Sequence, residues 1–173
     1  MRTQTIAIFG ANTPGGIQIT TGLAGGKHKL LLPAGENLAD VQWMAIDLQK
    51  HFANADVEAV DCGHEAAWEA DIIIVAVAIE ELTALCGKIR DVASRKIVVH
   101  VTDAVNENTA ALYNSLLPHS KHVNVITEWS GKKSVVFVQS NNSAALDEVA
   151  ELLEEVGITP VTTAYSDEHK ERA

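Results

Sequence analysis

The chain is poor in cysteine, in long apolar runs and in positive charge, and each shortage excludes a class of protein. Its two cysteines, Cys62 and Cys86, lack the spacing of a metal site, so reduced and unreactive thiols are expected. The longest apolar run, Ile72 to Ile79, is far too short to cross a bilayer. Residues 1–4 lead directly into a predicted strand, without an apolar leader and cleavage site. We therefore expect a cytoplasmic protein without a membrane-spanning segment.

Lysine and arginine together number 13 against 23 aspartates and glutamates, which gives a formal net charge of −10. A surface this acidic argues against binding to nucleic acid or docking on an anionic membrane. It also opposes binding of a phosphorylated ligand unless local dipoles overcome the overall field. Hydrophobic residues make up 47% of the sequence, which fits an ordered globular protein. A length of 173 residues predicts one domain that covers the whole chain, 1–173.

One segment, residues 5–16, has the pattern of a buried strand that enters a glycine-containing turn and then a helix. Gly10 and Gly15 stand at the first and third positions of G-x-G-x-x-G, and Asn12 stands at the second. In a dinucleotide-binding loop of this kind, backbone N–H groups and the helix N-terminus face a pyrophosphate. An ordinary strand–turn–helix without a ligand is the other interpretation.

The start of the helix in this segment has its own signals. Asn12 or Thr13 can cap it, and Pro14 suits the first helical position, where no N–H is needed. Gly15 and Gly16 would allow the helix to pack closely on the strand.

Predicted strands and helices alternate along the entire sequence. Strands are predicted at residues 5–9, 29–32, 56–60, 71–78, 96–101, 121–126, 134–139 and 158–162, and helices at 14–24, 36–52, 65–70, 80–92, 106–117 and 143–156. Trp68 is expected to pack inward from its short helix. The aliphatic run at 71–78 is typical of a central parallel strand that is covered on both faces. The pattern predicts an α/β fold, a Rossmann-like, doubly wound and mostly parallel sheet with helices on both faces.

Ligands of such sheets bind beyond the carboxyl ends of the strands, where the strand order reverses. Four segments are expected to meet there: 10–15, 33–36, 78–80 and 102–105.

Taken together, several segments resemble the coenzyme F420-dependent NADP oxidoreductase family. The matching segments are Ile6–Gly10 with Gly15, Ala70–Ala78, Lys96–Ala104, Ser134–Val138 and Gly157–Val161. Their order and spacing carry the resemblance, since no single segment is specific. More weakly, Thr163–His169 is similar to the end of the nucleotide domain of prephenate dehydrogenases.

The resemblance implies a Rossmann domain that transfers a hydride between NADP and a deazaflavin or another small acceptor. Such a transfer depends on two rings held face to face more than on acid–base groups, so no catalytic side chain is assigned. The family's architecture also implies a homodimer. The implied cofactor-binding residues are Gly10, Asn12, Thr13, Pro14 and Gly15 at the pyrophosphate, Ala76, Val77 and Ala78 near the adenosine ribose and nicotinamide, and Thr102 and Asp103 near the nicotinamide.

The sequence departs from the family at the residues that distinguish NADP from NAD. The family's second strand ends in a Ser-Arg pair that reaches the 2′-phosphate of NADP, whereas residues 32–35 here are Leu-Pro-Ala-Gly. An acid at the strand end, as in NAD enzymes, is also missing, and Glu36 is the nearest one. Asp103 replaces a neutral asparagine. The resemblance alone thus favours NADP over NAD, and the alternative is a non-catalytic nucleotide-binding or protein-interaction domain.

Other polar residues each have two interpretations. His100, at the end of a predicted central strand, could donate a proton at the rim or be an ordinary strand histidine. Trp129 could stack on a flat ring or cover the sheet edge. The spacing of His119 and His122 suits two turn residues, and without a third ligand no metal site is expected. The motifs of hydrolases and P-loop phosphotransferases do not occur.

Overall fold

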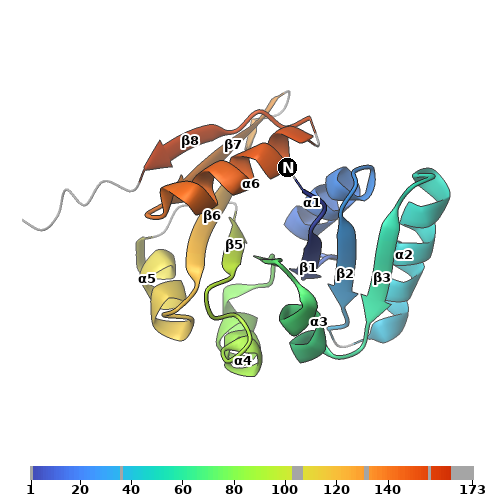
Figure 1. The fold of residues 1–173 in the computed structure, drawn as a ribbon, viewed down its shortest axis with the longest axis horizontal. Coiled ribbons are helices and arrows are strands. Elements are labelled where there is room, and N and C mark those ends of the chain that lie inside the picture. The colour runs from blue at the N-terminus through green and yellow to red at the C-terminus, as the bar shows by residue number, and fades with distance from the viewer. Residues whose placement is uncertain (1, 36, 103–106, 131–132, 156, 165–173) are drawn as a thin grey trace, which may run out of the picture.

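The computed structural model describes residues 2–35, 37–102, 107–130, 133–155 and 157–164. Its centre is an eight-stranded sheet in the order β3-β2-β1-β4-β5-β6-β7-β8 (Figure 1). The strands are β1 (Thr5–Phe9), β2 (Lys29–Pro33), β3 (Asp56–Val60), β4 (Ile72–Val75), β5 (Ile97–Thr102), β6 (Lys121–Ser130), β7 (Lys133–Ser140) and β8 (Val161–Ala164). Strands β1 to β6 are parallel, and β7 is antiparallel to β6 and parallel to β8. The predicted α/β, doubly wound sheet is confirmed, and the strand order reverses between β1 and β4.

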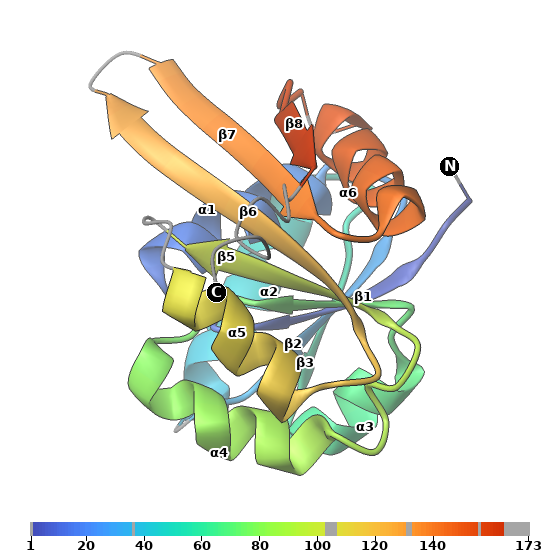
Figure 2. The same ribbon diagram turned by 90° about the vertical axis from the view of Figure 1, so that its left-hand side faces the viewer.

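Helices cover both faces of this sheet (Figure 2). They are α1 (Pro14–Ala24), α2 (Leu38–His51), α3 (Gly63–Glu69), α4 (Ile79–Ile89), α5 (Glu107–Leu116) and α6 (Ser143–Glu155). Buried residues of α1, α2 and α6 form one core cluster with the sheet, and buried residues of α3, α4 and α5 form a second cluster on the other face.

Strand β4 shows why its sequence is aliphatic throughout. Ile72 and Ile74 belong to the first core cluster, whereas Ile73 and Val75 belong to the second. Successive side chains of a strand point to opposite faces, so a strand covered on both faces has no position for a polar residue.

The prediction that Trp68 packs inward is wrong, because its side chain is 70% exposed. Helix α3 has seven residues and buries Ala66 and Ala67 instead. With these small residues on its inner face, the short helix lies directly on the sheet and leaves the indole outside.

The last strand begins three residues later than predicted. Gly157 has a φ of 80°, and the N–H of Ile158 bonds back to the carbonyl of Leu153 over 3.0 Å. This is the glycine-terminated helix end of the Schellman type. Residues 158–160 therefore lie between α6 and β8 rather than in a strand.

The β6–β7 hairpin extends past the rest of the sheet (Figure 2). The last pair between β5 and β6 is Thr102 with Ile126, yet β6 continues to Ser130 and stays paired with β7. Both strands are thus longer than predicted. The side chain of Trp129 lies outside what the structure describes, so its two interpretations stay open.

Two remaining expectations concern thiols and membrane segments. Both cysteines are free thiols; Cys86 is buried in α4, where burial raises the pKa of its thiol to about 11, and Cys62 is exposed. In the part of the chain that the structure describes, no helix has the length and apolar character to cross a membrane.

Candidate dinucleotide-binding site

The loop between β1 and α1 crosses directly over the end of β4. Gly10 follows β1 with a φ of 78°, a conformation that residues with a side chain rarely adopt. A Cβ at this position would lie 2.7 Å from the carbonyl oxygen of Ala76. Only glycine therefore allows the chain to turn here at this distance from β4.

Two further glycines bring α1 close to the loop and to the sheet. A Cβ on Gly16 would lie 1.9 Å from the carbonyl oxygen of Gly10, which is a severe clash with backbone. A Cβ on Gly15 would lie 3.1 Å from Cγ1 of Val101 in β5. Both glycines therefore allow the close helix packing that was expected of them. A side chain is less tolerable at Gly16, where it would clash with backbone, than at Gly15, where it would meet a side chain.

Thr13, and not Asn12, is the side-chain cap of α1. Its Oγ1 accepts a hydrogen bond from the N–H of Gly16 over 3.1 Å. The same hydroxyl lies 2.8 Å from the carbonyl oxygen of Gly10 and 2.9 Å from that of Ala76, which share its one proton. Thr13 thereby fastens the loop to β4, and its hydroxyl is fully used by the protein.

The first turn of α1 keeps one backbone donor for a ligand. Pro14 has no N–H, and the N–H of Gly16 is bonded to Thr13. Among the described residues the N–H of Gly15 has no acceptor. Asn12 is exposed. The geometry fits an anion at this helix terminus.

Charge distinguishes α1 from the helices that follow β2, β3 and β4. Helix α1 has no acidic residue in its first turn, whereas α2 has Asp40, α3 has Glu65, and α4 has Glu80 and Glu81. A carboxylate in the first turn offsets the positive end of the helix dipole. Of these four helix N-termini, α1 alone leaves that partial charge for another anion.

The structure brings together most of the expected site segments. The N–H of Ala76 bonds to the carbonyl of Phe9 over 2.9 Å, and Val101 packs beside Gly15, so the ends of β1, β4 and β5 meet at the loop. Val77 is half-buried, and Ala78 is exposed at the start of α4. Thr102 ends β5 beside these segments.

Asp103 and Glu36 lie outside the described residues, as do positions 104 and 105 of the expected rim.

His100 lies in the core and not at the rim. Its side chain is 1% exposed, and its ring stacks on Tyr113 of α5 with ring centroids 3.2 Å apart. Its Nε2 lies 2.9 Å from Nδ1 of His122. Nε2 of His122 lies 2.8 Å from the carbonyl oxygen of Leu117. The interpretation as a strand histidine is the one this geometry supports.

This arrangement defines the protonation of both rings. A carbonyl only accepts, so His122 carries its proton on Nε2 and presents Nδ1 as an acceptor. His100 must then donate from Nε2, which leaves its buried Nδ1 without a partner among the described residues. Burial lowers the pKa of His100 well below its usual value, with His122 adding to the effect, and burial also lowers the pKa of His122.

His122 lies in β6, as the strand predicted at 121–126 implies, so the interpretation of it as a turn residue is wrong. Its contact with His100 was missed because it depends on strand register. Val98 pairs with His122, which puts His100 and His122 on the same face of neighbouring strands, two positions apart. The turn assignment of His119 is correct. Within the described residues, no three His, Cys, Asp or Glu side chains come together as a metal site.

No protein-family model matches the chain, and no curated protein sequence matches it. Solved structures do share its fold. A pyrroline-5-carboxylate reductase of Coxiella burnetii matches 96% of this chain with a TM-score of 0.74 and 16% identity. The NADP-bound pyrroline carboxylate reductase of Plasmodium falciparum matches 96% of it with a TM-score of 0.69 and 16% identity. This chain covers 60% and 59% of those two proteins, respectively.

A third structure carries the name of the family that the sequence resembles. It is a protein of Arthrobacter sp. FB24 with the provisional name of F420-dependent NADP reductase. It matches 93% of this chain at 18% identity with a TM-score of 0.67, and this chain covers 84% of it. The resemblance stated from the sequence is therefore confirmed at the level of the fold.

Proposed function

We propose that this protein is an oxidoreductase that transfers a hydride between a nicotinamide dinucleotide, NADP(H) or NAD(H), and a small acceptor or donor. One observation carries the proposal, the geometry of the β1–α1 loop. Gly10 and Gly16 leave no room for side chains there, and the N–H of Gly15, at a helix terminus without a carboxylate in its first turn, has no acceptor in the described part of the chain. A diphosphate is the group that such a loop receives in doubly wound folds. The fold is shared with an NADP-bound pyrroline carboxylate reductase and with a protein provisionally named as an F420-dependent NADP reductase, which supports the same assignment.

The residues of this chain would mainly hold and orient the cofactor. The N–H of Gly15 and the N-terminus of α1 would hold the diphosphate, while Thr13 keeps the loop against β4. Val77, Ala78 and Thr102, at the ends of β4 and β5, would lie beside the ribose and nicotinamide. A bound nicotinamide supplies the hydride. Because the buried His100 is kept neutral, the proposal assigns no acid–base group and attributes catalysis to positioning.

The acceptor is proposed from the family resemblance, which favours a deazaflavin. The same resemblance is the reason to propose a homodimer, which light scattering of the pure protein tests. A second candidate is a nucleotide-binding domain without a reaction. It is favoured by Asn12 in place of the second glycine of the motif and by the lack of an arginine in residues 32–35.

A titration with one matched pair of variants tests the proposal. NADH and NADPH are added separately to the pure protein, and nicotinamide fluorescence and the melting temperature are recorded. A ligand at 100 times its dissociation constant adds about 2.7 kcal/mol, and so raises the melting temperature by about 5–11 °C. If neither cofactor changes either signal at millimolar concentration, the proposal is wrong.

The variants are Asn12→Asp in the loop and Asn54→Asp in the turn before β3. Both positions are exposed, and both substitutions add one negative charge to the protein. Asn12→Asp should weaken both cofactors at least about tenfold by repelling the diphosphate, whereas Asn54→Asp should leave binding unchanged. Equal effects of the two variants would show that binding occurs elsewhere. With binding established, loss of NAD(P)H absorbance in a screen of acceptors, with a deazaflavin first, separates an enzyme from a binding domain.

A further inference from the structure

The segment between β2 and α2 governs which ribose a doubly wound dinucleotide-binding domain accepts. A carboxylate in this region favours a ribose with free hydroxyls, and a nearby arginine accommodates a 2′-phosphate. From Leu32 to Asp40 the sequence has two carboxylates, on Glu36 and Asp40, and no lysine or arginine.

The described part of this segment is open to a ligand. The N–H of Ala34 bonds to the carbonyl of Val60 over 2.8 Å, which fixes the end of β2 beside β3. A Cβ built on Gly35 would meet no atom within 4 Å. The space next to Gly35 is therefore free of other described atoms, and the charge of the neighbouring side chains would decide which ribose is accepted there.

The carboxylate of Asp40 is held at the beginning of α2. Asn37 caps this helix, with Oδ1 accepting the N–H of Ala39 over 3.0 Å. Its Nδ2 donates to Oδ1 of Asp40 over 3.2 Å. The negative charge of Asp40 thus occupies the helix terminus to which a 2′-phosphate would otherwise be attracted.

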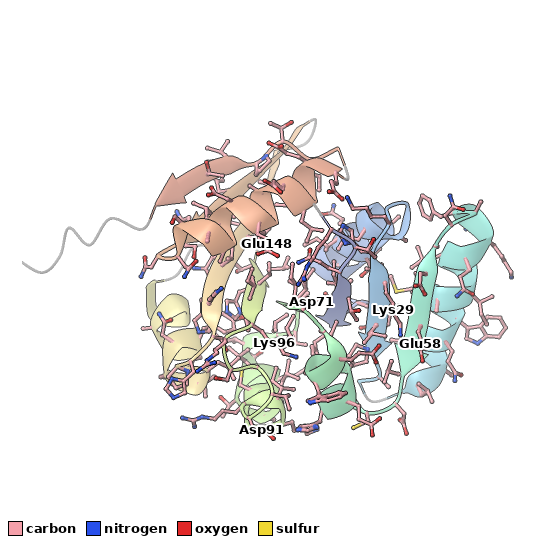
Figure 3. The ribbon with its side chains drawn as sticks, in the orientation of Figure 1. Lys29, Glu58, Asp71, Asp91, Lys96 and Glu148 are labelled. Carbon is pink, nitrogen blue, oxygen red and sulfur yellow. The ribbon has the colours of Figure 1, made fainter. Side chains whose placement is uncertain are left out.

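No cation compensates this charge among the described side chains. The lysine and arginine side chains that the structure describes all lie where strands begin or helices end, at the opposite edge of the sheet: Arg2, Lys27, Lys29, Lys50, Lys88, Arg90, Arg95, Lys96 and Lys121. Figure 3 shows Lys29 and Lys96 at the starts of β2 and β5. Lys29 is also paired with Glu58 and Glu69, at 3.2 Å and 2.9 Å.

We propose that the site selects a dinucleotide with a free 2′-hydroxyl, NAD(H), over one with a 2′-phosphate, NADP(H), and that Asp40 contributes to this selection. This inference rests on the proposed function and departs from the cofactor that the family resemblance implies. The 2′-phosphate adds up to two negative charges, which would face Asp40 inside a protein of net charge −10.

Calorimetric titration of NADH and NADPH into the wild type and two variants tests the inference. Asp40→Arg and Asp47→Arg change the net charge equally, and the two positions lie about 10 Å apart along the same helix. Asp47 is exposed and near the other end of α2. The wild type should bind NADH at least about tenfold more tightly than NADPH, and this ratio should shrink as salt is added.

Asp40→Arg should shift the NADH-to-NADPH ratio by about tenfold toward NADPH, and Asp47→Arg should change it by less than about twofold. The neutral Asp40→Asn variant should shift the ratio in the same direction by a smaller amount, and it avoids a cation at the start of a helix. Melting curves confirm that each variant is folded. Tighter wild-type binding of NADPH overturns the inference and leaves the proposed function standing, whereas binding of neither cofactor overturns both. Equal shifts in the two arginine variants would show that Asp40 makes no specific contribution to the selection of NAD(H) over NADP(H).

Discussion

Replacement of Thr13 by valine tests whether one hydroxyl holds the candidate site together. Valine keeps the branched shape of threonine and removes only the oxygen. That oxygen caps the N–H of Gly16 at 3.1 Å and donates to the carbonyls of Gly10 and Ala76. The substitution therefore separates the loop from β4 without opening a large cavity.

The expected loss of stability can be worked out from these contacts. Loss of a threonine cap costs about 1 kcal/mol. The donated hydrogen bond, shared between two carbonyls, contributes about 1 kcal/mol more. The Thr13→Val variant should lose about 2 kcal/mol, equal to a fall of about 4–8 °C in melting temperature for a chain of this size. The Thr13→Ser variant keeps the hydroxyl and removes one methyl group, so it should lose less than about 1 kcal/mol.

Urea unfolding of the wild type and of both variants measures these free energies. Cofactor titration of the same samples should show weaker binding for Thr13→Val than for Thr13→Ser, because the loop is no longer fastened to β4 at Ala76. Equal unfolding free energies for the valine and serine variants would refute the reasoning, since they differ in the hydroxyl to which the effect is assigned.

Further predictions concern the buried histidines and two glycines. Since burial lowers the pKa of His100 and His122 in the folded state, the unfolded chain binds more protons below its histidine pKa of about 6.5. Stability should therefore be complete above that pH and fall as the pH is lowered, and an unchanged urea midpoint between about pH 7.5 and pH 5.5 contradicts this. Gly16→Ala should cost about 3 kcal/mol or more, because its Cβ would lie 1.9 Å from the carbonyl oxygen of Gly10. Gly87→Ala, in open space on α4, should instead stabilise the protein by about 0.5–1 kcal/mol in the same unfolding assay.

The fold could be predicted because its signals are local. The aliphatic residues of β4 alternate between two cores, and Gly10 and Pro14, only four residues apart, mark the turn into α1. Element ends were less predictable. The end of α6 depends on the backbone of Gly157, whose turn takes up residues that have the composition of a strand. The prediction for Trp68 was wrong because the face of α3 that packs on the protein consists of two alanines, Ala66 and Ala67, and does not include the largest side chain of the helix.

The candidate site was predictable in position and less so in its contacts. The glycine spacing indicated the loop, and composition left Asn12 and Thr13 as equal candidates for the cap. Thr13 is fixed as the cap by its hydrogen bond to the carbonyl of Ala76. Ala76 is distant in sequence and lies beside the hydroxyl because β1 pairs with β4. The contact of His100 with His122 likewise depends on the register between β5 and β6.

The distribution of charge reconciles an acidic protein with the proposed binding of a dinucleotide. The lysines and arginines whose side chains are described lie at the edge where the parallel strands begin, so among these groups any net attraction for an anion at the other edge must come from the backbone. Helix α1 leaves its positive end uncompensated, while Asp40 compensates that of α2. In the proposed complex, a diphosphate at α1 would meet main-chain donors, whereas a further phosphate near α2 would meet the carboxylate of Asp40. A protein of this net charge would then bind the diphosphate and disfavour the 2′-phosphate, because the two groups would face helix termini of different charge.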